Sequence, residues 1–313
     1  MEILDLRHFG SVDLRPLLEE ESGVWQELLS WDYDASAEMI LRYIDSKILP
    51  GYVAIERGRI LGYCFFVYEG AKGVIGDVFV DSYTGARRTE IERELITQVV
   101  STLQQSPGIH RIEAQLLLHD TGTAAEPFDA EGFRRYARLF MCLPVGRDHF
   151  NSTPLPPGYQ IRSWQEQDYQ SAASIITAAY RSHVDSEIND QYRTVTGSLR
   201  FLNNIVRFPG CGVFDQESSF VVHHAPTRTN VGVLLCSRVR HDVGHITQVC
   251  LLPEHRNHGL GEHLIEAAYR AISRRNYSQL SLTVTEANTR AVALYKRLGF
   301  DVSRVFDAFV WEG

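Results

Sequence analysis

The sequence predicts an α/β (α+β) protein built from two tandem domains of the same kind. The chain has 313 residues, 44% of them hydrophobic, which favours two domain cores over one. A polar, proline-rich stretch from Gly146 to Gly158 separates two halves of about 150 residues. Both halves carry strand and helix patterns in the same order. We therefore expect domains at 1–148 and 159–313, joined by a linker at 149–158.

The first half begins with a β-hairpin. Two apolar runs within Tyr52–Phe66 flank a turn at Arg57–Gly58, which is typical of a hairpin. The patterns that follow predict a strand at 74–80, a helix at 91–103 and a strand at 112–118.

The second half repeats this order. The patterns predict strands near 219–224, 231–240 and 244–252, a helix from 261 and a strand at 279–285. Equivalent landmarks lie 170 residues apart for Gly62 and Gly232, 171 for Asp77 and Gln248, and 167 for Gly132 and Gly299. This nearly constant offset indicates duplication of a whole domain.

A glycine-containing loop joins the third strand of the second half to its helix. The strand ends at Pro253, and Gly259 and Gly261 open a helix whose buried face is Leu264, Ile265, Ala268 and Ile272. Free N–H groups and the dipole at a helix N-terminus favour a phosphate, and glycine lets the backbone approach it closely. Arg256 adds a planar cation suited to phosphate oxygens.

Three kinds of loop fit this spacing to different degrees. A dinucleotide-binding fingerprint needs a third glycine where Leu264 stands, and a nucleotide P-loop needs a Gly-Lys-Ser/Thr sequence that is absent. An ordinary strand-to-helix turn that uses glycine for a positive φ remains open.

A second block decides which family the chain resembles. Asn288 is a good N-cap, residues 291–298 have a helical pattern, and Gly299 fits the residue that ends the helix. Pro-x-x-Arg-x-x-Gly-x-Gly (253–261) followed by Asn-x-x-Ala-x-x-Leu-Tyr-x-x-x-Gly-Phe (288–300) resembles the acyl-CoA-binding core of the GNAT superfamily of N-acyltransferases. With the duplication, the whole chain resembles a tandem GNAT protein, similar in architecture to mycothiol synthases.

The resemblance implies a fold, a cofactor and a set of site residues. Each domain would be a mixed, mainly antiparallel sheet flanked by helices, and acetyl-CoA would be the co-substrate. Tyr295 would be the general acid that protonates the leaving thiolate, for which a phenol is suited. The backbone near Val249 would hold the pantetheine arm and polarise the thioester carbonyl. The implied cofactor-binding residues are Val249, Cys250, Leu251, Arg256, Asn257, His258, Gly259, Leu260, Gly261 and Asn288.

The general base is not identified by the resemblance, and it is either a chain of water molecules or a side chain. Thr283 and Gln248 stand where some relatives carry an acid. The polar segment Tyr180–Tyr192, which would cover the acceptor site, supplies His183, Asp185, Glu187 and Asp190 as candidates. His241, His245 and Glu286 are further candidates, and each of the seven is equally compatible with an ordinary solvated or structural residue. The histidines show no metal-ligand spacing, so no metal is expected.

The first half lacks the residues that this chemistry needs. Arg88 and Glu90 occupy the positions of Gly259 and Gly261, while Thr121 and Phe128 occupy those of Asn288 and Tyr295. We therefore expect a degenerate, non-catalytic first domain.

Composition narrows the functional class further. The net charge is −8, from 31 basic and 39 acidic residues, which argues against nucleic acid as the main partner. The N-terminus lacks a signal-peptide pattern, and no apolar run approaches the roughly 18 residues of a membrane span, so we expect a cytoplasmic protein without a membrane partner. The five cysteines (Cys64, Cys142, Cys211, Cys236 and Cys250) include no Cys-x-x-Cys pair and are expected to be reduced thiols.

Two functions therefore remain for the chain. The first is an N-acetyltransferase that acts on a primary amine of a small molecule or peptide N-terminus by direct attack in a ternary complex. The alternative is a non-catalytic acyl-CoA-binding or sensor module.

Overall fold

The backbone forms two compact units. The computed structural model describes residues 1–146, 150, 153–207 and 212–313. Unit 1 comprises Met1–Arg138 and Val305–Gly313, and unit 2 comprises Leu139–Arg304. These units are defined by contacts, whereas the domains at 1–148 and 159–313 were inferred from sequence repeats and remain a prediction. Part of the predicted linker, like Cys211, lies outside the described residues.

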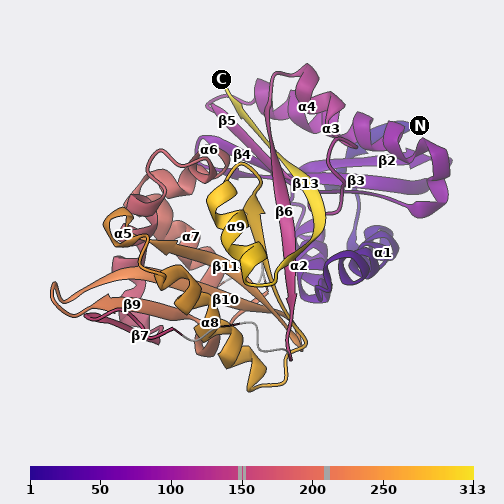
Figure 1. The fold of residues 1–313 in the computed structure, drawn as a ribbon. Coiled ribbons are helices and arrows are strands. Elements are labelled where there is room, and N and C mark those ends of the chain that lie inside the picture. Colours follow the sequence, from indigo (N-terminus) through magenta and orange to yellow (C-terminus); the bar gives the residue numbers. More distant parts are fainter. Residues whose placement is uncertain (147–149, 151–152, 208–211) are drawn as a thin grey trace. The chain divides into compact units, whose positions relative to one another are not determined.

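Unit 1 is a mixed, mainly antiparallel sheet with helices (Figure 1). Its strands follow the order β1 (Glu2–Asp5), β2 (Gly51–Glu56), β3 (Arg59–Glu69), β4 (Lys72–Val80), β5 (Arg111–Gln115) and β13 (Asp301–Glu312). Only β4 and β5 pair in parallel among these neighbours. The helices are α1 (Ser11–Leu29), α2 (Asp34–Asp45), α3 (Arg88–Gln105) and the short α4 (Glu126–Ala130), with 3-10 turns η1 (Leu6–His8) and η2 (Ser82–Arg87).

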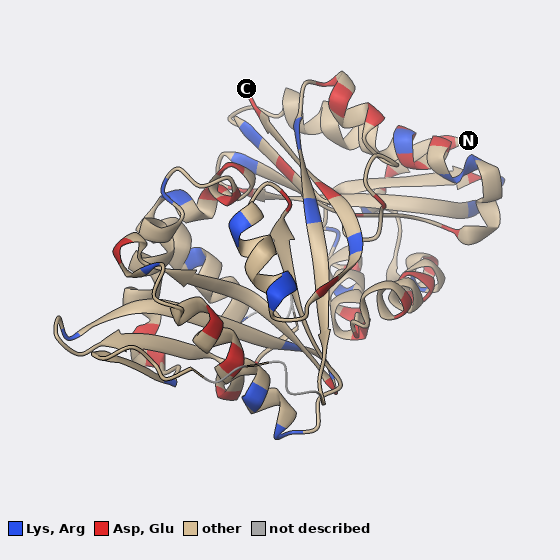
Figure 2. Ribbon diagram, viewed as in Figure 1, with Lys and Arg blue, Asp and Glu red and all other residues tan. Residues whose placement is uncertain are grey.

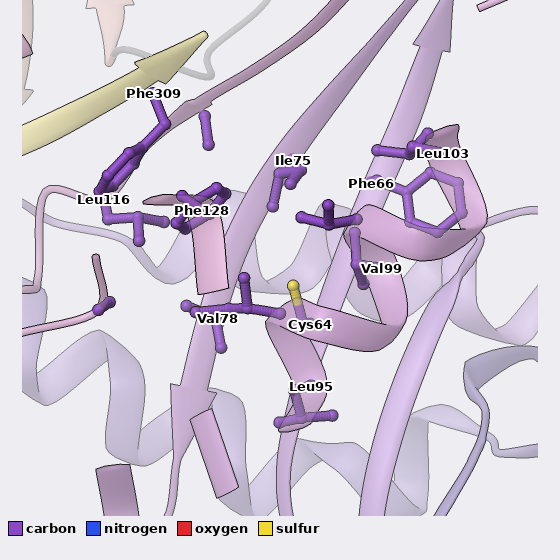
Figure 3. Close-up of a cluster of buried hydrophobic side chains, with 14 of the residues drawn as sticks. Cys64, Phe66, Ile75, Val78, Leu95, Val99, Leu103, Leu116, Phe128 and Phe309 are labelled. Atoms are coloured by element: carbon purple, nitrogen blue, oxygen red, sulfur yellow. The ribbon is translucent and has the colours of Figure 1, made fainter. Parts of the chain in front are cut away.

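The core of unit 1 lies between the sheet and α3 (Figure 3). Leu95, Val99 and Leu103 recur at helical spacing along α3 and face Cys64 and other apolar residues of the strands. Phe309 of β13 belongs to the same cluster, so the C-terminal strand is part of this core.

Unit 2 contains the remaining elements. Its strands are the later part of β6 (Arg134–Pro144), then β7 (Tyr159–Ser163), β8 (Val213–Phe214), β9 (Phe220–His224), β10 (Thr229–Arg240), β11 (Val243–Leu251) and β12 (Gln279–Thr285). The α-helices are α5 (Tyr169–Ala179), α6 (Asp185–Ile188), α7 (Val195–Arg207), α8 (Leu260–Ser273) and α9 (Thr289–Arg297). Short 3-10 turns lie at η3 (Glu166–Asp168), η4 (Asp190–Arg193), η5 (Gln216–Ser218) and η6 (Pro253–His255).

Helices cover both faces of the unit 2 sheet (Figure 1). Leu235 of β10 packs into an apolar cluster with α5 and α7. The next residue, Cys236, lies beside Gly244 together with Ile272 of α8. Because successive strand residues point to opposite faces, α5 and α7 lie on one face and α8 on the other.

The elements predicted from the sequence are present in the structure. The hairpin turn falls at Arg57–Gly58, both with positive φ, and the predicted helices correspond to α3, α8 and α9. The strand expected at 112–118 ends at Gln115, and Leu116 and Leu118 are buried in the turn that follows. The apolar run there therefore reflects burial of a turn rather than a longer strand.

Candidate active site

The candidate site lies where the neighbouring strands β11 and β12 move apart. The two strands pair in parallel from Val243–Gln279 to Ile246–Leu282, but β11 continues to Leu251 and β12 to Thr285. A cavity of about 590 Å³ lies at this divergence, and all its lining residues belong to unit 2. This volume is in the usual range for a small-molecule or cofactor site.

The loop before α8 has the geometry that the sequence predicted. Gly259 is the N-cap of α8 with a φ of +74°, a conformation that favours glycine. Gly261 has room for a side chain, because a Cβ there would meet only Leu294 at 3.6 Å and Leu251 at 3.9 Å. The packing of the protein therefore does not require glycine at 261. A glycine there instead fits a ligand that approaches the backbone closely at the first turn of α8.

Arg256 braces the loop against a neighbouring helix. Its Nη2 donates to the carbonyl oxygen of Ala179 at 2.7 Å, and its Nε donates to that of Leu251 at 3.4 Å. The guanidinium lines the cavity while it holds the C-terminal end of α5, so a role with phosphate would be shared with this structural one.

The predicted cofactor residues gather at the cavity with one exception. Val249, Cys250, Leu251, Arg256, Asn257, Gly259, Leu260, Gly261 and Asn288 line it. His258 does not; it is exposed, and its ring contacts the Arg256 carbonyl. Asn288 is the N-cap of α9 and accepts a hydrogen bond from the Ala291 N–H at 3.3 Å.

Tyr295 faces the cavity from α9. It is 7% exposed, and burial raises the pKa of its phenol, with further contributions from the charge of Asp185 and from Cys250. The phenol therefore holds its proton at neutral pH. Burial also raises the pKa of the neighbouring Cys250 thiol to about 12.

The segment after α5 brings one carboxylate into the cavity. Asp185 and His183 both line it, and the Thr285 hydroxyl at the end of β12 donates to Asp185. The Asp185 backbone N–H donates to His183 Nδ1 at 3.1 Å, so in this arrangement Nδ1 is the unprotonated nitrogen of the ring.

The other candidates for the general base lie elsewhere. Glu187 and Glu286 are exposed and do not line the cavity, nor does Asp190. The His241 side chain is 85% exposed. His245 is buried against Ser281 and Phe140, and burial lowers its pKa to about 3, so it stays neutral.

Basic residues on α9 were not predicted as part of the site. Arg290 and Arg297 line the cavity beside the loop, and their helix carries blue segments in Figure 2. Arg290 donates to the Asn257 side chain, and Arg297 pairs with Glu262 at 3.1 Å. Their spacing of seven residues, two helical turns, is the sequence pattern that places both on one side of α9.

The corresponding region of unit 1 contains its own ion pairs. Arg88 at the start of α3 donates to Glu92 at 2.8 Å and lies over the Phe79 ring at 5.8 Å. His119 also bonds to Glu92, at 3.3 Å. Burial raises the pKa of Glu92, but hydrogen bonds from His119 and Arg88 outweigh that effect and lower it.

Phe128, the counterpart of Tyr295 expected from the sequence offset, is a core residue of unit 1. It is fully buried, and its ring stacks on Phe309 at 4.1 Å. Since phenylalanine has no hydroxyl, the position offers no proton donor.

Comparison with known proteins places unit 2 in a family. Residues 163–300 match the model of the Acetyltransferase (GNAT) family. This region is a GNAT domain. Mycothiol acetyltransferase from Renibacterium salmoninarum is 26% identical over 236 residues, which are 72% of this chain and 60% of that protein. N-alpha-acetyltransferase from Sulfurisphaera tokodaii is 31% identical over 71 residues, 22% of this chain and 42% of that protein. The chain thus spans less than two thirds of either relative's length.

Solved structures extend the likeness to the whole chain. The GCN5-related N-acetyltransferase from Sphaerobacter thermophilus has a TM-score of 0.63 at 16% identity and covers 99% of this chain and 95% of its own. The tandem GNAT protein from the clavulanic acid biosynthesis pathway has a TM-score of 0.60 at 16% identity and covers 99% and 98%. At these identities the likeness shows the fold, and the predicted tandem GNAT architecture is confirmed.

Membrane-spanning helices and metal-binding clusters are both absent from the described ranges. None of their helices has both the length and the apolar composition needed to cross a bilayer. Within the same ranges, no group of three His, Cys, Asp or Glu side chains is placed to hold a metal ion.

Proposed function

We propose that this GNAT protein is an acyl-CoA-dependent N-acetyltransferase that transfers acetyl from acetyl-CoA to a primary amine of a small molecule or a peptide N-terminus. The observation that carries the proposal is the content of one cavity. It combines the open N-terminus of α8 and three arginines with a carboxylate, Asp185, and a protonated phenol, Tyr295.

Acetyl-CoA fits the loop side of the cavity, which we define as residues 256, 257 and 259–262 with Arg290 and Arg297. The first-turn N–H groups of α8 and these cations suit the pyrophosphate. The open space at Gly261 allows close approach. Asn288, at the start of α9, is proposed as a further cofactor contact.

Asp185 is the proposed general base. Its carboxylate attracts the ammonium form of the acceptor, which releases one proton to solvent to become the nucleophilic amine. Asp185 then takes the second proton, which the nitrogen loses as the new C–N bond forms, and passes it to solvent. Bound acetyl-CoA supplies the acetyl group as a reactive thioester. As the C–S bond breaks, the Tyr295 hydroxyl gives its proton to the sulfur and later regains one from solvent.

Direct transfer is favoured over an acyl-enzyme. Cys250 is the one thiol among the described residues that line the cavity. Because burial raises its pKa to about 12, almost none of it is thiolate at neutral pH, and the thiolate is the nucleophilic form. The acetyl group would therefore pass straight to the amine in a ternary complex.

Thiol release from acetyl-CoA over a panel of primary amines tests the proposal. Asp185→Asn should reduce kcat/KM by about 10²–10⁴-fold, the usual contribution of general base catalysis. Glu187→Gln is the matched control, since it removes an exposed carboxylate from the same helix. Equal rates in the two variants would contradict the role of Asp185. Binding of acetyl-CoA without thiol release for any amine would instead support a non-catalytic acyl-CoA sensor.

A further inference from the structure

Gln248 on β11 has a buried amide of which only one end is satisfied. The residue is one of those that line the cavity, and it is 5% exposed. Oε1 accepts hydrogen bonds from the Tyr180 hydroxyl at 2.8 Å and from the Val249 N–H at 3.2 Å. Nε2 is buried and has no hydrogen-bond partner among the described residues.

The orientation of this amide follows from its neighbours. A backbone N–H can only donate, so the side-chain oxygen, not the nitrogen, must face Val249. Flipping the amide would place two donors together. The NH₂ group is therefore the end left without an acceptor, and a buried donor in that state is costly.

Aromatic packing fixes the Tyr180 hydroxyl that holds the amide. The Tyr180 ring stacks on Tyr192 at 4.5 Å, and Tyr192 meets Phe201 of α7 edge-on at 4.9 Å. Tyr180 also belongs to the wall that carries His183 and Asp185. The Gln248 amide is thus held on the side of the cavity assigned to the acceptor.

We propose that Gln248 is a specificity-determining residue, whose Nε2 donates a hydrogen bond to a neutral hydroxyl or carbonyl oxygen that the acceptor carries near its reacting amine. The inference rests on the proposed function and narrows its substrate class. A neutral oxygen is favoured over a carboxylate because Asp185, on the same wall, repels a second negative charge. Amino alcohols and amino amides share this chemistry, whereas simple alkylamines lack it.

Matched pairs of amines test the proposal. One pair is 2-aminoethanol and propylamine, and another is 3-aminopropanamide and butylamine. Thiol release should be faster for the oxygen-bearing member by about 10- to 100-fold in kcat/KM, the discrimination expected when the analogue leaves a buried donor unpaired. A preference for the hydroxyl pair alone or the amide pair alone identifies which oxygen is read.

Three variants separate recognition from folding. Gln248→Glu keeps an oxygen for Tyr180 and Val249 but removes the NH₂ donor, and Gln248→Met removes the donor without adding charge. Both should bring the ratio within each pair to about one or below. Tyr180→Phe keeps the NH₂ group but frees the amide, so an intermediate ratio is expected. Melting temperatures identify any variant that fails to fold.

Two results would overturn the inference. An unchanged ratio in Gln248→Glu and Gln248→Met would show that Nε2 reads no acceptor oxygen. A tenfold or greater loss of acetyl-CoA affinity with the ratio preserved would assign the donor to the cofactor instead.

Absence of thiol release by the wild-type protein would count against the proposed function. Titration of the same pairs into the CoA complex then tests Gln248 alone. A preference for the oxygen-bearing amine that Gln248→Met abolishes would support the inference, and no preference would refute it.

Discussion

The Tyr295→Phe substitution removes one hydroxyl from the cavity and little else. The Tyr295 ring packs 5.9 Å from Phe300, a contact that phenylalanine keeps. The described residues offer its hydroxyl no hydrogen bond, so the substitution leaves no polar group unpaired. The free energy of unfolding should therefore fall by less than about 1 kcal/mol, and acetyl-CoA affinity should not change.

The turnover rate, in contrast, should fall strongly in Tyr295→Phe. Burial, Asp185 and Cys250 raise the pKa of the phenol, so the protein holds a neutral proton donor in the cavity. Loss of a general acid costs about 10²–10⁴-fold in kcat, equivalent to about 3–5 kcal/mol in the activation free energy.

The assay is kcat and melting temperature measured on the same preparations, with rapid-mixing kinetics to establish that chemistry limits the rate. Tyr277→Phe is the matched control, because Tyr277 is 8% exposed, also lacks a hydroxyl hydrogen bond among the described residues, and lies outside the cavity lining. An unchanged kcat in Tyr295→Phe, with chemistry rate-limiting, would remove the phenol from the mechanism.

Three further outcomes are expected. Titration with acetyl-CoA should give one site per chain, because Arg88 occupies the corresponding region of unit 1; two equivalent sites would contradict this. Gly259→Glu should abolish acetyl-CoA binding in a folded protein, whereas Gly259→Asn, which tolerates a φ of +74°, should retain most of it; equal affinity in both variants would show that the loop does not hold the cofactor. Burial and the nearby Asp77 raise the pKa of Glu21 well above its ordinary value of 4.5, so the stability that this proton provides is complete below that pH and is lost as the pH rises through the shifted pKa. Melting temperatures should therefore fall more steeply from pH 4.5 to 8 in the wild type than in Glu21→Gln, and parallel curves would refute the assignment.

The sequence predicts best where one residue type is physically required. Gly259 needs a positive φ, and Asn288 caps α9 through its own side chain. The role of each residue can therefore be predicted from its residue type and its place in the sequence. Strands and helices with one buried face, such as β12 and α8, are equally readable because their apolar period matches their geometry.

Features that depend on tertiary contacts are harder to predict from the sequence. Asp185 is one of several polar residues in its segment. Its place in the cavity lining and the hydrogen bond from Thr285, 100 residues away, distinguish it from Glu187. In the sequence Gln248 stands where some relatives carry an acid, whereas the hydrogen bond to its side-chain oxygen from the Tyr180 hydroxyl, 68 residues away, appears only in the structure. Such sites are set by contacts between distant segments, which spacing along the chain does not encode.

The assignment of Val305–Gly313 to unit 1 has a consequence for synthesis of the protein. This segment of β13 pairs with β5, and the ion pair between Arg111 and Glu312 joins residues 201 positions apart. A ribosome makes the chain from its N-terminus, so β5 emerges long before its partner strand. In the sheet of unit 1, β5 therefore stays without its partner β13 until all of unit 2 has been made. During that interval β5 is the place where a strand from another nascent chain would compete for pairing.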